Sequence, residues 1–355
     1  MIMSLLNVLH CPKCQGDLSL DSFKEEADTI VDGCLLCAKC NVIYPIINEI
    51  PRMVPMNLYD SSGFCAEYGV LAGALFSTWE DVPNEVKELQ SHTSHNFGHE
   101  WDYYSTLGWT DATGVDASNI EETFNWFHEK SLLEKDDLNG KFILDAGCGN
   151  GRFSRAAMDL GGTVVSMDLT HAVEVAHGNL KRNGGTPHNI QGDILHLPFK
   201  PESFDVVFTI GVIQHTGAPL EAAAKLAGLV KKEGLFSVRS YRRGNARMEE
   251  NDAAIRAVTT TFSQDELHEF ADILSKLTVF LGKKGLYTAV TRHICLFGKR
   301  YDLFDWYSAP VAAKLTYREM RDVFSQCGIT PIRDLDDGTS PEDRNFTALS
   351  IVGRK

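Results

Sequence analysis

The feature that most constrains the fold is a glycine-rich segment in the middle of the chain, residues 142–153. An apolar run ending in Ile143 and Leu144 has the composition of a buried strand, and Asp145 follows at its carboxyl end, where open α/β sheets place their ligand sites. Glycines then let the backbone turn sharply and approach a ligand closely, and a helix beginning at Arg152 would direct its N–H groups into the same crevice. The glycines are Gly147, Gly149 and Gly151. This segment predicts a strand, a turn and a helix, but alone it also fits a turn without a ligand.

Alternating strands and helices are predicted after the turn. A strand over 163–168 ends in Asp168, which lies about twenty residues beyond the turn, where a carboxylate can accept both hydroxyls of a ribose. The next strand ends near Asp193. Further strands are predicted over 204–210 and 234–241, with helices over 172–181 and 218–230. This alternation is typical of an α/β fold with a parallel, doubly wound sheet.

The glycine spacing bears on which cofactor the sheet binds. It is G-x-G-x-G and lacks the G-x-G-x-x-G pattern that places a helix against a pyrophosphate. Asp145, which precedes the first glycine, would repel a pyrophosphate but suits a cation or hydroxyl groups. We therefore expect a nucleoside cofactor without phosphates rather than a nicotinamide dinucleotide.

Five segments, in order, resemble the motifs of class I S-adenosylmethionine-dependent methyltransferases: LDAGCGNGRFS, VVSMDLT, QGDILHLPF, FDVVFTIGVIQHT and LVKKEGLFSVRSY. They cover about residues 136–241. The resemblance implies a seven-stranded Rossmann-like sheet and S-adenosylmethionine as the cofactor. One departure is Lys232-Glu233-Gly234, where the family usually has Pro-Gly-Gly at a turn remote from the cofactor.

The resemblance also implies roles by position. Gly147, Gly149 and Gly151 would pass under the methionine and ribose portions, and Asp145 would anchor the amino end, directly or through water. Asp168 would hold the ribose hydroxyls, and Asp193 would accept from the adenine amino group. The remaining positions are Ile194, packed on the adenine ring, and Ile210 and Gly211, at the methyl-donor end.

Two CxxC pairs near the start of the chain predict a zinc site. Cys11 and Cys14 are separated from Cys37 and Cys40 by a polar stretch that suggests a hairpin or loop. Four thiolates with this spacing form a closed tetrahedral zinc site with a structural role, whose metal supplies folding energy. Redox-active or unrelated thiols are the alternative. Cys34 offers a competing CxxC with Cys37, but it lies in an apolar, strand-like run.

The segment over about residues 8–56 resembles the zinc-ribbon subunit that activates several tRNA, rRNA and protein methyltransferases. The similarity rests on CPKCQGDLSL, the second CxxC, and the stretches IYPI and IPRM. It implies a stabilising or docking role rather than catalysis, and leaves open which of the two applies.

Composition limits the partners. The net charge is −14, with 48 acidic and 34 basic residues, so a broad surface for nucleic acid is not expected. No apolar run approaches membrane-spanning length, and the N-terminus lacks the pattern of a secretory signal. Paired and scattered cysteines favour a reduced compartment. We expect a cytoplasmic protein; its oligomeric state is left undetermined.

Candidate catalytic and substrate residues lie around the predicted sheet. His215 follows the fourth strand and is our candidate base, although its position favours a histidine that only holds a loop by hydrogen bonds slightly more. An aromatic-rich loop over 97–104, which includes Trp101, is interpreted either as a lid or as packing for the ribbon. Asp305, Trp306 and Tyr307 either face the substrate or pack the roof of its pocket.

The predicted division of the chain is a ribbon (1–56), a linker and lid (57–135), a cofactor-binding core (136–244), a helical insertion roofing the substrate pocket (245–305) and the end of the sheet (306–355). Within these, helices are expected over 71–76, 120–133, 262–277, 286–297 and 317–327, and final strands over 329–335 and 346–352. The predicted function is methyl transfer to a small-molecule or sugar-like acceptor, at oxygen first and nitrogen next. The alternatives are a tRNA or protein methyltransferase and a non-catalytic S-adenosylmethionine-binding protein.

Overall fold

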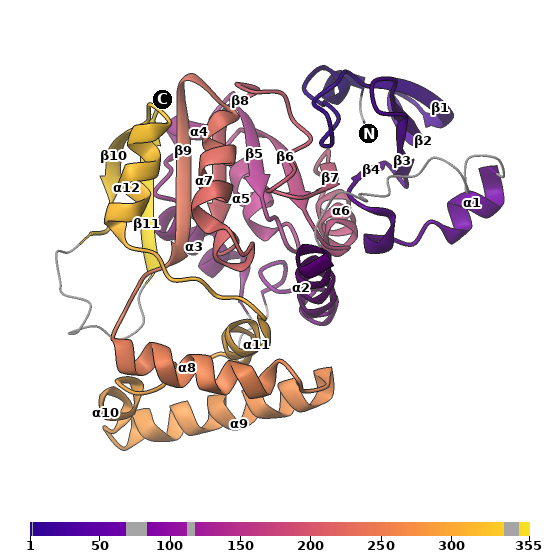
Figure 1. Ribbon diagram of the computed structural model, residues 1–355. Coiled ribbons are helices and arrows are strands. Elements are labelled where there is room, and N and C mark those ends of the chain that lie inside the picture. Colours follow the sequence, from indigo (N-terminus) through magenta and orange to yellow (C-terminus); the bar gives the residue numbers. More distant parts are fainter. Residues whose placement is uncertain (2, 69–83, 112–117, 337–347) are drawn as a thin grey trace.

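A computed structural model describes residues 1, 3–68, 84–111, 118–336 and 348–355 (Figure 1). The strands are β1 (Ser19–Glu26), β2 (Thr29–Cys37), β3 (Val42–Ile47), β4 (Ile50–Met53), β5 (Phe142–Ala146), β6 (Thr163–Asp168), β7 (His188–Gly192), β8 (Phe204–Ile210), β9 (Val230–Tyr241), β10 (Thr330–Asp334) and β11 (Ala348–Arg354). Within the described residues they form one continuous sheet in the order β1-β2-β3-β4-β7-β6-β5-β8-β9-β11-β10.

The helices are α1 (Ser62–Tyr68), α2 (Asn84–Tyr103), α3 (Ile120–Ser131), α4 (Lys135–Leu138), α5 (Arg152–Asp159), α6 (Ala172–Arg182), α7 (Pro219–Gly228), α8 (Ala246–Thr259), α9 (Gln264–Lys283), α10 (Tyr287–Thr291), α11 (Arg300–Ser308) and α12 (Tyr317–Gln326). Short 3-10 turns are η1 (Met3–Asn7), η2 (Met56–Leu58) and η3 (Ile213–His215). None of the described helices is both long and apolar enough to cross a bilayer.

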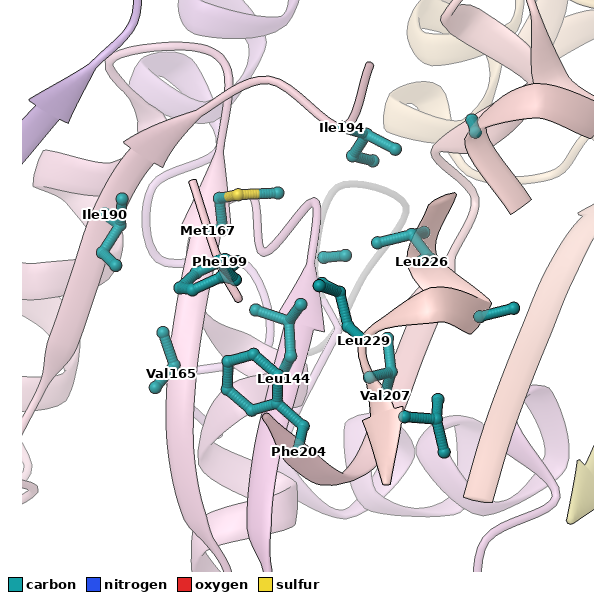
Figure 2. Packing of buried hydrophobic residues seen from close by; sticks show 14 of the residues in the cluster. Leu144, Val165, Met167, Ile190, Ile194, Phe199, Phe204, Val207, Leu226 and Leu229 are labelled. Carbon is teal, nitrogen blue, oxygen red and sulfur yellow. The ribbon is translucent and has the colours of Figure 1, made fainter. Parts of the chain in front are cut away.

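The seven strands β7-β6-β5-β8-β9-β11-β10 form the expected doubly wound sheet, with β11 antiparallel to both of its neighbours. Successive side chains of β5 point to opposite faces. Ile143 packs with Phe127 of α3, whereas Leu144 packs on the face covered by Leu226 of α7. Figure 2 shows the second of these clusters. Both faces of the sheet are therefore buried, which explains the near-continuous apolar runs of its strands.

The ribbon is joined to the main sheet through its last strand. Its last strand, β4, pairs in parallel with β7, with Arg52 opposite Gln191 and Met53 opposite Gly192. Arg52 is buried and donates to the side chains of Gln191 (3.1 Å) and Glu174 (2.8 Å). The four strands of the ribbon thus extend the methyltransferase-like sheet beyond the edge that β7 would otherwise leave exposed.

Helices α8 to α11 form a cap beyond the carboxyl ends of the parallel strands (Figure 1). Asp252, fully buried on α8, joins parts of the cap: it accepts from the Cys295 N–H (3.2 Å) and from Trp306 Nε1 (3.1 Å), and the Tyr307 hydroxyl oxygen lies 3.3 Å from its Oδ1. Lys314 Nζ lies 3.5 Å from its carboxylate.

Three sequence-based expectations change in this region. The helix expected over 286–297 is the short α10, because the Cys295 N–H and C=O bond to Asp252 and Tyr307 instead of continuing a helix. Residues 97–103 belong to helix α2 rather than to a loop. The missing Cβ of Gly98 makes room for His171, whose ring would lie 2.2 Å from that atom. Helix α8 was not anticipated.

Other expectations meet the structure more closely. Helix α12 begins at Tyr317, where its start was predicted, and Thr316 and Glu319 form a capping box there. The two predicted final strands, β10 and β11, pair antiparallel. The helix expected over 71–76 and the start of the strand expected at Phe346 lie outside the described residues.

Candidate functional site

The glycine turn follows β5 as the sequence predicts. Gly147, Gly149 and Gly151 have φ angles of +92°, +52° and +84°, a region that favours glycine. A Cβ on Gly147 would lie 2.2 Å from Val212, and one on Gly149 would lie 2.7 Å from the ring of Trp101. The turn therefore needs glycine both for its backbone angles and for its close neighbours.

Two acids lie at the ends of neighbouring strands, beside this turn. Asp168 ends β6 and accepts from the Gly149 N–H (2.9 Å) and from the N–H and hydroxyl of Thr170 (both 3.0 Å). Burial raises the pKa of Asp168 even though these bonds favour its ionised form. Asp193 follows β7 and accepts from the Leu195 N–H (2.9 Å) and from His196 Nδ1 (2.8 Å). Both carboxylates are thus fixed in position by local hydrogen bonds.

A cavity of about 130 Å³ runs across these strand ends. Six of the nine residues predicted to hold the cofactor line it: Gly147, Asp168, Asp193, Ile194, Ile210 and Gly211. Gly149 and Gly151 lie in the turn behind this wall. Asp145 is buried and accepts from Ser154 Oγ (2.6 Å), which in turn accepts from Ser166 Oγ (2.8 Å).

Helix α2 supplies the opposite wall of this first cavity, so the segment interpreted as a possible lid does border it, as a helix instead of a loop. Gln90, Thr93, Phe97 and Trp101 recur at helical spacing and line the cavity. Gln90 Nε2 donates to Asp193 Oδ2 at 2.7 Å. The spacing of these four residues is a usable signal, but Gly98 and the aromatic composition favoured a loop.

A second cavity, of about 260 Å³, lies next to the first, beneath the cap. Trp101, Ile210, Gly211 and Asp305 line both cavities. The second cavity has many charged residues in its wall: Glu100, Lys130, Arg152, Arg239, Asp302 and Asp305. The end of β8 therefore stands between an elongated cavity over the glycine turn and a polar one under the cap.

The remaining candidates fall in different places. Trp306 lines the second cavity, although its Nε1 is engaged with Asp252, while Tyr307 turns into the cap, where its hydroxyl donates to the Cys295 carbonyl (2.8 Å). His215 lines the first cavity with both ring nitrogens engaged: Nδ1–H donates to the Val311 carbonyl (2.6 Å), and Nε2 lies 3.1 Å from the Gln214 amide nitrogen. Burial lowers the pKa of His215 to about 4.

Asp305 lines both cavities, and its pKa is shifted in the opposite direction from that of His215. Its carboxylate accepts from the Tyr241 hydroxyl (3.1 Å), and it belongs to α11, the cap helix that lies over the end of β8. Burial raises the pKa of Asp305. It is thus a carboxylate with increased basicity at the junction of the two cavities.

The four cysteines of the ribbon converge as predicted. The Sγ atoms of Cys11, Cys14, Cys37 and Cys40 all lie within 4.8 Å of one another, with 3.5 Å from Cys11 to Cys40 and 3.4 Å from Cys14 to Cys37. Tetrahedral zinc–thiolate bonds of about 2.3 Å place sulfur atoms about 3.8 Å apart. The four thiols therefore fit a structural zinc ion.

The backbone around the thiols has the form of two tight turns. Gln15 and Asn41, which follow the second cysteine of each pair, have φ angles of +57° and +54°. A Cβ on Gly16 would lie 3.3 Å from the sulfur atoms of Cys14 and Cys37, so glycine keeps this side of the site open. Cys34 packs with apolar neighbours in β2, outside the cluster, which confirms the choice of Cys37 and Cys40.

Two parts of the chain match known families. Residues 144–238 match the family described as "Methyltransferase domain", and residues 4–49 match "Trm112p-like protein". An uncharacterized protein of Methanocaldococcus jannaschii is 31% identical over 159 residues, which cover 44% of this chain and 67% of that protein.

Two named enzymes are also similar. A ubiquinone biosynthesis O-methyltransferase of Haemophilus ducreyi is 30% identical over 34% of this chain and 52% of its own length. A tRNA U34 carboxymethyltransferase of Desulfotalea psychrophila is 35% identical over 28% of this chain and 32% of its own length. The chain thus spans about half, or a third, of the named enzymes that it matches.

Proposed function

Since this chain belongs to the S-adenosylmethionine-dependent methyltransferases, we propose that it transfers a methyl group to an oxygen atom of a small molecule held in the second cavity. The observation that carries the proposal is the common wall of the two cavities, formed by Trp101, Ile210, Gly211 and Asp305. A methyl donor in the first cavity and an acceptor in the second would meet at this wall. Methyl transfer depends chiefly on such positioning, which contributes up to ~7–11 kcal/mol in well-oriented reactions.

The first cavity suits the parts of S-adenosylmethionine. Asp168, held by Gly149 and Thr170, would accept from the ribose hydroxyls, and Asp193 would accept from the adenine amino group. The Gln90 amide now donates to Asp193, as an adenine amino group would, which supports this assignment. When bound, the cofactor supplies a methyl group on a positively charged sulfur.

Helix α2 must give way for this cofactor. The first cavity measures about 130 Å³, Trp101 of α2 lies against Gly149 of the turn, and Gln90 of α2 lies on Asp193. A ligand of this size needs a cavity of roughly 300 Å³ or more. We therefore expect α2 to shift outward, with Gln90 exchanging its hydrogen bond to Asp193 for the one made by adenine.

Asp305 is better placed than His215 to act as the base. A hydroxyl acceptor must lose its proton as the new O–C bond forms, and a carboxylate with a raised pKa is the stronger proton acceptor. The ring nitrogens of His215 are engaged with Val311 and Gln214, and its lowered pKa makes it a weak base. In this assignment His215 holds the loop after β8, and Asp305 takes the proton.

The second cavity favours a small acceptor. Residues of cap helix α11 line it, and its volume of about 260 Å³ fits a compact polar molecule. The runner-up is a tRNA or protein substrate that inserts one nucleotide or side chain; the Trm112p-like ribbon supports it, and the net charge of −14 opposes it for tRNA. Nitrogen is the second choice of acceptor atom.

The test follows a labelled methyl group. We would incubate the protein with methyl-tritiated S-adenosylmethionine and a source-cell extract separated into small molecules, bulk tRNA and protein. Label in the small-molecule fraction, reduced ~10²–10⁴-fold by Asp305→Asn, is expected for a base acting on a hydroxyl. Label in tRNA or protein would instead establish the runner-up, and a failure to bind S-adenosylmethionine in calorimetry would exclude both.

A further inference from the structure

The wall of the second cavity holds an unusual set of charges. Three cationic side chains belong to the sheet and its helices: Lys130 on α3, Arg152 at the start of α5 and Arg239 on β9. Three carboxyl groups come from α2 and the cap: Glu100, Asp302 and Asp305. In the described structure, no cation of this set lies within ion-pair distance (4.0 Å) of a carboxylate of the set.

The direct contacts of two of these cations are with aromatic rings. The Arg152 guanidinium lies 5.3 Å from the ring of Trp101 and 5.8 Å from that of Tyr301. Lys130 Nζ lies 4.7 Å from the ring of Trp126. Arg239 donates one hydrogen bond, to Ser350 Oγ at 3.1 Å. These contacts orient the cations but leave most of their N–H groups available to a molecule in the cavity.

Two of these groups are buried and lack a partner on their inner side. Glu100 is 2% exposed, and its Oε2 has no hydrogen-bond partner; Arg152 is 9% exposed, and its Nη1 has none either. Burial and the neighbouring arginines lower the pKa of Lys130 to about 7. Buried polar groups are normally satisfied, and leaving one unsatisfied costs ~1–3 kcal/mol. Arg152 Nη1 is therefore a buried donor that an anionic group in the cavity would satisfy.

The two kinds of charge come from different elements. The cations belong to α3, α5 and β9, whereas the carboxyl groups belong to α2 and α11. Of the carboxyl groups, Asp305 is the one that also borders the first cavity. A molecule bound here would turn a negative group toward the cations and a proton-donating group toward Asp305.

We propose that the methyl acceptor is a small hydroxylated anion whose carboxylate or phosphate is bound by Lys130, Arg152 and Arg239 while its hydroxyl faces Asp305. This rests on the proposed function. In the reaction, the acceptor O–H bond breaks and its proton passes to the Asp305 carboxylate. The acceptor oxygen forms the new O–CH₃ bond as the S–CH₃ bond breaks, and that electron pair remains on sulfur, leaving neutral S-adenosylhomocysteine.

The test uses inorganic phosphate and acetate as probes, with chloride at equal ionic strength as the reference and S-adenosylhomocysteine at saturation throughout. Lys130→Met is the main variant. Lys299→Met is its matched control, because Lys299 Nζ lies 4.6 Å from the same Trp126 ring but forms an ion pair with Glu122 (3.0 Å) and does not line the cavity. Unfolding midpoints and calorimetric Kd values are the readouts.

For the wild type we expect phosphate, acetate or both to raise the midpoint above that in chloride, and the preferred probe identifies the anionic group. Lys130→Met should raise the Kd for that probe roughly tenfold or more, as loss of one charged contact implies. It should also raise the midpoint of the free protein, because it removes a cation from beside Arg152 and Arg239. A purely structural lysine would show the reverse effect on the free protein.

Arg239→Gln provides a second variant and should also weaken anion binding. The proposal is overturned if neither anion stabilises the wild type more than chloride does, or if Lys130→Met and Lys299→Met respond alike. S-adenosylhomocysteine binding is measured in the same samples. Retained cofactor binding with no anion response would refute the anion site alone, whereas loss of cofactor binding in the wild type would refute the proposed function.

Discussion

Asp145 offers the sharpest test of the electrostatics around the glycine turn. It is 2% exposed and accepts one hydrogen bond from Ser154 Oγ, at 2.6 Å. Burial raises its pKa from 3.8 to about 7; the Ser154 bond opposes this shift and the charge of Asp168 adds to it. The perturbation is Asp145→Asn, which keeps the shape of the side chain and an oxygen for Ser154 but cannot ionise.

The expected effect depends on pH with a definite sign. A carboxyl whose pKa is higher in the folded than in the unfolded protein contributes stability that is fully present below pH 3.8 and is lost as pH rises through about 7. The shift of about 3 pKa units, at ~1.36 kcal/mol per unit, makes this loss about 4 kcal/mol at most. The variant Asp145→Asn has no such pH-dependent loss of stability. Its buried amide N–H groups instead lower the free energy of unfolding by ~1–3 kcal/mol at every pH.

The assay compares unfolding free energies of the wild type and Asp145→Asn between about pH 4.5 and about pH 8. The unfolding free energy of Asp145→Asn minus that of the wild type should increase as pH rises. Asp205→Asn is the control: burial raises the pKa of Asp205, but bonds from the Phe142 N–H and Lys231 outweigh it and lower that pKa overall. Its difference should stay nearly constant over this range, because the contribution of a carboxyl with a lowered pKa is complete above its unfolded value of 3.8 and is lost only at more acidic pH. Parallel curves for wild type and Asp145→Asn would refute the reasoning.

Three further predictions concern the ribbon and the cofactor. Cys14→Ser should remove bound zinc, measured by atomic emission, and lower the unfolding midpoint, whereas Cys34→Ser should keep the metal; equal zinc in both would contradict the assignment. Arg52→Met should destabilise the chain by ~1–3 kcal/mol in denaturant unfolding, because buried Gln191 Oε1 loses its donor, and an unchanged midpoint would count against this coupling. Asp168→Ala should raise the calorimetric Kd for S-adenosylmethionine roughly tenfold or more while far-UV circular dichroism stays unchanged; an unchanged Kd would remove Asp168 from the cofactor site.

The elements that the sequence predicted well are those fixed by local chemistry. Gly147 and Gly151 follow a buried strand and have the backbone angles that only glycine adopts easily, so their pattern reports directly on the turn. The helix predicted over 317–327 begins at Tyr317, where Thr316 caps it through a hydrogen bond from the nearby Glu319 N–H. The spacing within each CxxC pair likewise favours a tight turn that brings its two thiols together, and the thiols of Cys11 and Cys40 converge as expected.

The elements that it missed depend on partners far away in the chain. Gly98 was interpreted as part of a loop because the ring of His171, which needs the space, is 73 residues away in the sequence. The cation group of the second cavity unites Lys130, Arg152 and Arg239, each of which alone fits a solvated surface position. Local patterns cannot report such clusters, because only the tertiary fold brings their members together.

The pairing of β4 with β7 was equally invisible in the sequence, yet it links the ribbon to the cofactor cavity. Gln191, fully buried on β7, accepts from Arg52 and donates to the carbonyls of Leu58 (2.9 Å) and Leu169 (3.0 Å). Leu169 directly follows Asp168, and Gln191 stands two residues before Asp193.

One side chain therefore joins the ribbon to the backbone beside both acids of the first cavity. Zinc holds the ribbon together, so its removal should reduce S-adenosylmethionine affinity as well as stability. Because the ribbon is part of the same chain, this dependence should not change when the protein is diluted, whereas a ribbon acting as a separate subunit would be lost on dilution. A cofactor Kd that is unchanged after chelation of the zinc would show that the ribbon stabilises the edge of the sheet without influencing the site.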